Sequence, residues 1–86
     1  MDMIDQEIMR IKGRTDDLKN RIIPDFEHKT EALYARIIPL EKGHPERDKL
    51  EAEYTRLSKE LRLRSDELIN SRQEIENLEL QKKMRR

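Results

Sequence analysis

The sequence contains no cysteine and no tryptophan, and its 86 residues include only two glycines, three prolines, one phenylalanine and two tyrosines. The lack of cysteine excludes disulfides, thiolate metal sites and cysteine nucleophiles. With two glycines in total, the chain has no glycine-rich phosphate-binding loop. Because aromatic side chains supply much of the volume of a globular core, their scarcity argues against a compact domain of this length.

Apolar residues of every kind are also scarce. Hydrophobic residues make up 34% of the chain and charged residues 44%, yet 19 basic and 19 acidic side chains cancel to a net charge of +0. Disordered chains usually combine low hydrophobicity with a high net charge, whereas interspersed charges among Glu, Lys, Arg and Leu are typical of coiled coils and long helices. We therefore expect an all-α chain whose apolar residues form narrow stripes.

No run of apolar residues approaches the roughly 20 that a membrane span requires. The first ten residues carry acidic side chains and lack the apolar segment of a signal peptide. We therefore expect an intracellular protein, cytoplasmic or nuclear, that has no contact with a membrane.

Two heptad stripes predict the architecture. Within Ile4–Ile22 and within Leu50–Lys82, seam positions recur at alternating steps of four and three, which places them on one face of a helix. Residues between Phe26 and Leu40 continue an apolar face. The candidate seam residues are Ile4, Ile8, Ile11, Leu18, Ile22, Phe26, Leu33, Leu40, Leu50, Tyr54, Leu57, Leu61, Leu68, Ile75 and Leu78.

Three polar residues, Thr15, Arg64 and Ser71, interrupt these stripes. A polar side chain at a seam position disfavours registers that leave it without a partner. We expect these three residues to make the pairing of the helices specific.

Glycine and proline divide the chain into segments. Gly43 suits the left-handed position just past a helix end, and Pro45 suits the first position of the following helix. We predict a first helical arm over residues 1–42, kinked or broken near Pro24 and Pro39. A turn follows over 43–45, and a long second helix with a basic C-terminal end occupies 46–86.

Two arrangements of the arms remain open. In an antiparallel hairpin centred on the turn, partner residues have numbers that total about 90, and apolar residues then often face each other. In a kinked parallel coiled-coil rod, Arg64 and Lys82 would each meet their own copies inside the seam, which is unfavourable. We therefore favour the hairpin.

A two-helix hairpin leaves most of each helix exposed, and small scaffolds need additional stabilisation. We expect this one to dimerise or to dock on a partner helix. The apolar residues outside the stripes that would supply such a contact are Met9, Ile23, Leu63, Ile69 and Leu80.

The sequence offers no arrangement suited to catalysis. A catalytic site needs a nucleophile with an oriented base, or paired carboxylates in a shielded pocket, and narrow helical stripes form no such pocket. The two histidines, His28 and His44, lack the close spacing of zinc ligands. We expect no enzyme activity, no metal, no cofactor and no small-molecule substrate.

Two hypotheses for function follow. The first is a structural coiled-coil segment for protein–protein interaction and oligomerisation, which scaffolds or spaces a larger assembly such as the cytoskeleton. The alternative is a dimeric helical module that binds a polyanionic polymer, a microtubule or a nucleic acid, through its basic C-terminal helix. Its candidate contacts are Arg56, Lys59, Arg62, Lys82, Lys83, Arg85 and Arg86.

Overall fold

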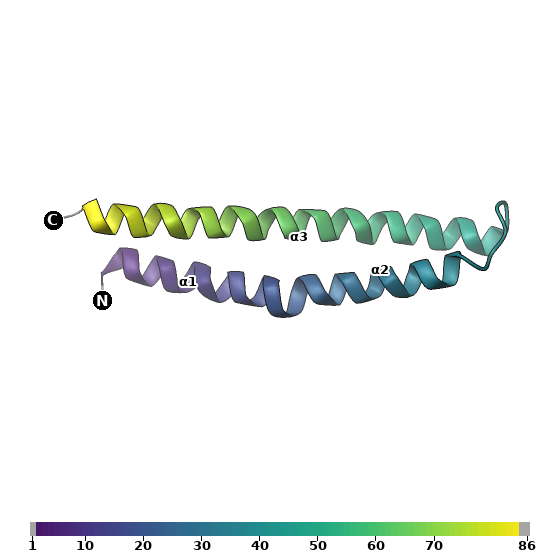
Figure 1. Ribbon diagram of the computed structural model, residues 1–86, viewed down its shortest axis with the longest axis horizontal. Coiled ribbons are helices and arrows are strands. Elements are labelled where there is room, and N and C mark those ends of the chain that lie inside the picture. Colours follow the sequence, from purple (N-terminus) through teal and green to yellow (C-terminus); the bar gives the residue numbers. More distant parts are fainter. Residues whose placement is uncertain (1, 85–86) are drawn as a thin grey trace.

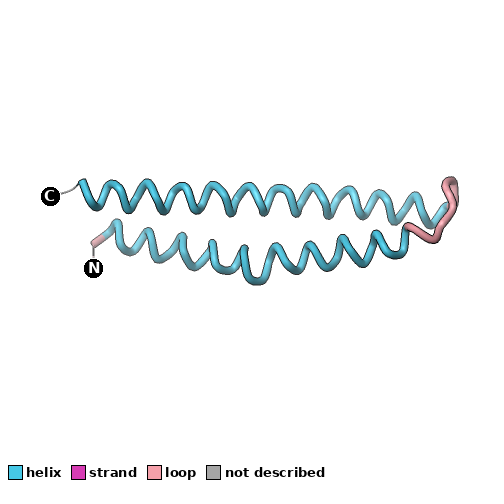
Figure 2. Tube along the Cα trace, viewed as in Figure 1, coloured by secondary structure: helices cyan, strands magenta, loops and turns pink. Residues whose placement is uncertain are grey.

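The chain forms a hairpin of two long helical arms in a computed structural model that describes residues 2–84 (Figure 1). The first arm comprises α1 (Met3–Asp17), the π-helical segment η1 (Leu18–Ile22) and α2 (Ile23–Ile37), and the second arm is α3 (Pro45–Met84). Both ends of the chain lie at one pole of the hairpin, and the turn lies at the other (Figure 2). The prediction of an all-α hairpin is confirmed.

The molecule is narrow and extended. Its dimensions are 65 × 16 × 14 Å, and its radius of gyration of 18.9 Å far exceeds the value of about 12 Å expected for a compact domain of this length. Because each arm has only the other arm as a neighbour, one face of each helix is covered and the remaining faces meet the solvent.

The buried core is a thin seam between the arms. Leu18 is fully buried, and Ile11 is only 4% exposed. Two buried threonines also lie in the seam, and their hydroxyl groups donate to carbonyls of their own arm: Thr15 to Ile11 over 2.8 Å and Thr30 to Glu27 over 2.9 Å. Since local carbonyls satisfy these hydroxyls, neither threonine requires a polar partner on α3.

The π-helical segment η1 corrects the phase of the first arm. From Leu18 the seam residues Ile22, Phe26 and Thr30 follow at three successive steps of four, whereas an α-helical seam needs steps of four and three in alternation. In η1 the N–H of Ile23 donates to the carbonyl of Leu18, five residues earlier. This wider turn accommodates one extra residue, so the apolar face remains directed at α3.

Proline accounts for the position of this wide turn. Pro24 is the second residue of α2, two residues after the end of η1, and it has no N–H to donate to the preceding turn, where its ring would also crowd a regular α-helix. The first arm therefore changes its helical geometry at Pro24 but continues as a helix.

The connection between the arms spans 38–44. Pro39 cannot donate a backbone hydrogen bond, so α2 ends at Ile37. Gly43 adopts a φ of 87°, a value that glycine tolerates far better than other residues. The Nδ1 atom of His44 accepts a 3.1 Å hydrogen bond from the N–H of Glu46 and so caps the start of α3.

Candidate protein interface

The two flanks of the seam differ in chemistry. We use the name charged flank for the side that carries Glu53, Glu60, Arg64 and Glu67 of α3, which recur at helical steps of seven, four and three. We use the name tyrosine flank for the opposite side. The tyrosine flank comprises Ile23, Thr30, Tyr34 and Ile38 of the first arm and its following turn, with Tyr54, Ser58, Leu61 and Ser65 of α3.

A network of ion pairs occupies the charged flank. Arg14 of α1 donates two hydrogen bonds to the carboxylate of Glu67, at 2.7 and 3.2 Å. Arg64 pairs with the same carboxylate at 2.8 Å and with Glu60 at 3.5 Å. The hydrogen bonds from Arg14, supported by those from Arg64, lower the pKa of Glu67 below its ordinary value. This flank therefore already satisfies its charges within the hairpin.

Further ion pairs join the arms near the two poles. Close to the chain ends, Asp5 pairs with Lys82, and Lys12 lies 3.6 Å from Glu79. Near the turn, Arg36 of α2 lies 3.5 Å from Glu46 of α3, and the guanidinium of Arg47 donates a hydrogen bond to the carbonyl of Leu40 in the connection. These contacts, together with Arg14–Glu67, fix the register of the arms.

The tyrosine flank is defined by a contact between its two aromatic rings. Tyr34 and Tyr54 have ring centroids 6.0 Å apart, so the sides of α2 and α3 that carry them adjoin. From Tyr54, the residues Ser58, Leu61 and Ser65 follow at steps of four, three and four, which places them on the same side of α3. The α3 part of this flank therefore carries no charge.

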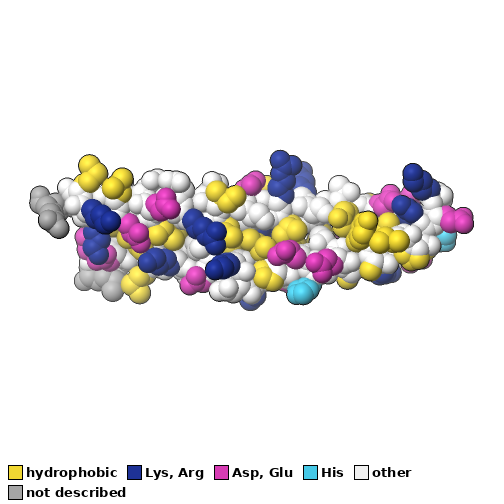
Figure 3. Space-filling model, viewed as in Figure 1, with side chains coloured by type: hydrophobic (Ala, Val, Ile, Leu, Met, Phe, Trp, Pro, Cys, Tyr) yellow, Lys and Arg dark blue, Asp and Glu magenta, His cyan; other side chains and the backbone are white. Residues whose placement is uncertain are grey.

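Hydrophobic side chains on this flank remain accessible to solvent. Tyr34 is 54% exposed and Ile38 60% exposed, while Tyr54 and Leu61 are half-buried. Figure 3 shows hydrophobic side chains gathered between the arms in the half nearest the turn, whereas charged side chains cross the seam in the other half. An accessible group of apolar and aromatic residues of this kind is typical of a protein interface.

Charged residues border the tyrosine flank with opposite signs on the two arms. Glu27 lies in line with Tyr34 on α2, two turns before it, and Glu31 lies on the outer edge of α2, one turn before Tyr34. Arg62 lies on the outer edge of α3, whereas Lys59 lies on the side of α3 opposite the seam, because it is nine residues, or two and a half turns, from Leu50 and from Leu68. All four side chains are exposed, and none of the four forms an ion pair within the described residues.

The candidate seam residues lie at the contact between the arms. None of them is exposed. Of the polar interruptions, Thr15 is buried, and Arg64 and Ser71 are half-buried. The buried members are Ile8, Ile11, Leu18, Leu50 and Leu57, and the half-buried members are Ile4, Ile22, Phe26, Leu33, Leu40, Tyr54, Leu61, Leu68, Ile75 and Leu78.

The apolar residues outside the stripes lie apart from one another. Ile23 is half-buried on the tyrosine flank, whereas Met9, Leu63, Ile69 and Leu80 are exposed on other surfaces of the two arms. The structure does not bring these five residues into one patch.

The candidate polyanion contacts divide into two groups. Arg56 pairs with Glu53 and Lys82 pairs with Asp5, so acidic neighbours already balance two of the basic side chains. Lys59, Arg62 and Lys83 are exposed and have no such partner within the described residues. Arg85 and Arg86 lie outside the described residues.

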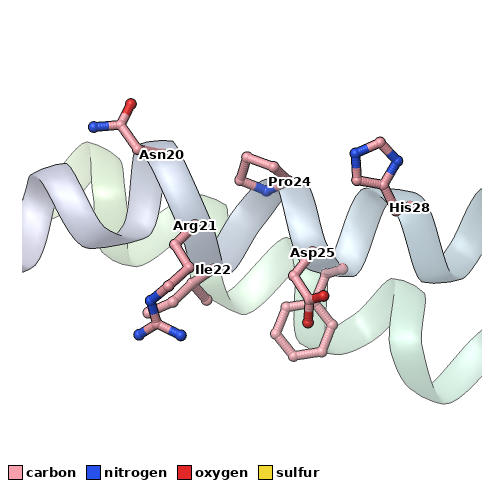
Figure 4. Close-up of a pocket in the computed structure, with 7 residues that line it drawn as sticks. Asn20, Arg21, Ile22, Pro24, Asp25 and His28 are labelled. Atoms are coloured by element: carbon pink, nitrogen blue, oxygen red, sulfur yellow. The ribbon is translucent and has the colours of Figure 1, made fainter.

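An open hollow lies beside the π-helical segment. Figure 4 shows Asn20, Pro24 and His28 projecting from one side of the arm, with Arg21 and Asp25 on the other, and Ile22 and Phe26 complete the lining. Asp25 pairs with Lys29 at 3.0 Å and Arg21 pairs with Asp17 at 2.7 Å, so each charge is balanced by a neighbour one turn away on the same arm. The hollow offers His28 no acid or base partner.

The described residues provide neither a metal site nor a membrane-spanning helix. Between residues 2 and 84, no three His, Cys, Asp or Glu side chains are grouped in a way that would hold a metal ion. In the same part of the chain, no helix combines the length and apolar character that crossing a membrane requires.

Sequence reasoning missed the tyrosine flank. The signal was present in Ser58 and Ser65, which lie at heptad steps beside the stripe residues Tyr54 and Leu61 and leave this side of a strongly charged helix without charge. What the sequence could not supply was the side of α2 that meets them, because the π-helical segment changes the phase of the first arm.

No family model matches this chain, and neither a curated protein nor a solved structure is similar to it.

Proposed function

We propose that this chain is a structural coiled-coil segment that associates through its helix faces and spaces the parts of a larger assembly. The observation that carries this proposal is the tyrosine flank, an accessible surface whose α3 part is uncharged and which lies directly beside a seam that buries few residues. Helices that expose such a surface gain stability when a second helical surface covers it.

The thinness of the seam supports association. Only six hydrophobic residues of the described part are buried, and a fully buried Leu or Ile contributes roughly 1.5–3 kcal/mol. Small scaffolds with so little buried area usually gain stability from disulfides, metals or association. Since the chain has no cysteine, burial of the tyrosine flank against another helix would supply stability that a disulfide cannot.

The shape supports a spacing role. The hairpin is 65 Å long and about a quarter as wide, and ion pairs between the arms hold its register from the chain ends to the turn. Such a rod keeps a partner bound at the turn far from whatever is joined to the other pole. The hairpin would therefore act as a spacer, because its two paired helices fix the distance between its poles.

Sedimentation equilibrium, combined with small-angle scattering, tests this proposal. We expect a mass that rises with concentration from 10.4 kDa to a multiple of it, and a longest dimension close to 65 Å. A chain that stays a helical monomer at every concentration would count against the proposal.

A pair of matched variants tests whether the seam holds the two arms together. Leu57→Asp places a charge at a seam position that is 8% exposed, so helicity and association should both fall. Leu63→Asp makes the same change on an exposed surface of the same helix and should keep helicity. Equal helicity in the two variants would show that the seam does not hold the arms together.

A further inference from the structure

We propose that the tyrosine flank binds a second copy of this chain about a twofold axis parallel to the long axis, which forms a four-helix bundle with both turns at the same pole. This inference rests on the proposed function and specifies its partner, surface and symmetry. It is carried by the placement of charges around the flank.

The chemistry of the two flanks selects the surface. The charged flank holds its ions in pairs with one another, and covering it would remove water from Arg14, Arg64 and Glu67. The tyrosine flank offers Tyr34 and Ile38, which are more than half exposed, beside an uncharged strip of α3. Tyrosine is enriched at the centres of interfaces, because it buries a large area while its hydroxyl remains hydrated.

The serines of the flank allow close approach. Ser58 and Ser65 are half-buried and separate the larger side chains of Tyr54 and Leu61 on α3. Small residues between large ones leave positions into which side chains of another helix fit. The strip therefore suits a helix better than a flat surface.

Two twofold arrangements can place this flank face to face with its copy. An axis parallel to the hairpin sets α2 of one copy against α3 of the other, with the turns together. An axis across the hairpin sets α2 against α2 and α3 against α3, with the turns pointing in opposite directions. The charges beside the flank distinguish these arrangements, because α2 carries Glu27 and Glu31 there and α3 carries Arg62.

The levels of the charges along the rod agree with the first arrangement. Residues that lie at the same level on α2 and α3 have numbers whose sum is close to 88, which is the sum for the contacting pair Tyr34 and Tyr54. The numbers total 89 for Glu27 with Arg62. Glu27 of one copy is then level with Arg62 of the other within about 1.5 Å, the rise of one helical residue.

The second arrangement would bring like charges together. Glu27 and Glu31 of one copy would approach the same residues of the other, and Arg62 would lie on the same side as Arg62 of the other copy. Like charges at an interface suppress an arrangement, whereas opposite charges favour it. Glu27, Glu31 and Arg62 form no ion pair within the described residues, so their charges are available to a partner.

Spin labels measure the symmetry directly. The chain lacks cysteine, so Lys42→Cys introduces a single label site at the exposed turn. In the turns-together dimer we expect a separation between labels comparable with the 16 Å width of the hairpin, rather than its 65 Å length. A label introduced by Asp66→Cys, near the middle of the rod and exposed, serves as the control for association.

Variants test the surface independently. Ser58→Arg on the tyrosine flank should weaken dimerisation about tenfold or more, because it places an unpaired charge in the interface. Asn70→Arg, on an exposed side of the same helix, should leave the dimerisation constant unchanged. Glu27→Lys and Arg62→Glu should each weaken the dimer, and the double variant should restore it.

The outcomes separate this inference from the function on which it rests. Short distances between the labels at the turn and selective loss of dimerisation with Ser58→Arg support the inference. A dimer whose turns are far apart, or one in which Ser58→Arg and Asn70→Arg behave alike, overturns the inference and leaves the proposed function standing. A wild-type chain that never associates overturns both.

Discussion

Leu18→Ala is the sharpest test of the seam. Leu18 is the only fully buried large side chain in the described part of the chain, and it lies where η1 turns the first arm back toward α3. Truncation removes three carbon atoms from this site, which corresponds to a transfer free energy of about 2.4 kcal/mol. Leucine-to-alanine changes in protein cores cost about 2–5 kcal/mol once the remaining cavity is included.

The narrow shape favours the lower half of that range. Each arm has only one helical neighbour, so side chains around the site can move into the space more readily than in a core enclosed on all sides. We expect a loss of about 2.5–3.5 kcal/mol. A chain of this length has a total stability of roughly 4–13 kcal/mol, so the change removes a large share of it.

Urea unfolding followed by circular dichroism at fixed protein concentration measures this loss. With a slope of about 1–3 kcal/mol per molar urea, the midpoint should fall by about 1–3 M. Leu63→Ala, at a site that is 48% exposed, is the control and should shift stability by about 0.5 kcal/mol or less. If both variants shift the midpoint equally, the described seam does not carry the stability of the hairpin.

Three further predictions concern the glycines and the ion-pair network. Gly13→Ala should stabilise the hairpin by about 1 kcal/mol, because a new Cβ meets no atom within 4 Å and glycine weakens a helix interior; thermal unfolding measures this gain. Gly43→Ala should destabilise it by about 1–2 kcal/mol, because the φ of 87° strains any side chain, and the same melts should show the opposite sign. For Glu67→Gln we expect a lower melting temperature than wild type at pH 7 and no difference near pH 2. The pKa of Glu67 lies below its ordinary value of 4.5 in the folded chain, so its contribution is present above that value and is lost as the pH falls through the lowered pKa. A difference that persists at pH 2 would mean that the Glu67 charge is not what the substitution removes.

Much of the fold could be predicted from the sequence because it depends on two local signals, the heptad spacing of a few apolar residues and the positions of glycine and proline. The heptad steps within Leu50–Lys82 indicate one long helix, and α3 occupies Pro45–Met84. Gly43 and Pro45 indicate the position of the reversal because each has a strong backbone preference. The connection begins earlier than the turn expected over 43–45, because the helix stops before Pro39.

The detail around Pro24 was harder to predict. Proline alone is consistent with a kink, a break or a helix start. In the structure, Ile22 and Phe26 are half-buried and Thr30 is buried, so the apolar face of the first arm stays directed at α3 and the helix does not break. The spacing of the seam residues indicates this change of phase, because the steps alternate between four and three before Leu18 and are all four from Leu18 to Thr30. Sequence reasoning did not use that change.

The capping and ion-pair contacts depend on three-dimensional proximity. The sequence assigns His44 no metal-binding role, and only the structure shows that its Nδ1 atom accepts a hydrogen bond from the backbone N–H of Glu46 in the first turn of α3. Arg14 and Glu67 are 53 residues apart, and the sequence contains many other acid–base combinations. Only the register of the arms identifies the pairs that form.

The common pole of the two chain ends has a practical consequence for engineering. Asp5 and Lys82 touch, so protein domains fused before Met3 and after Met84 would be tethered side by side, with the hairpin projecting as a spur between them. A donor and an acceptor fluorophore attached at these two sites would report fraying of the arms as a drop in energy transfer, while opening confined to the turn would leave the signal unchanged.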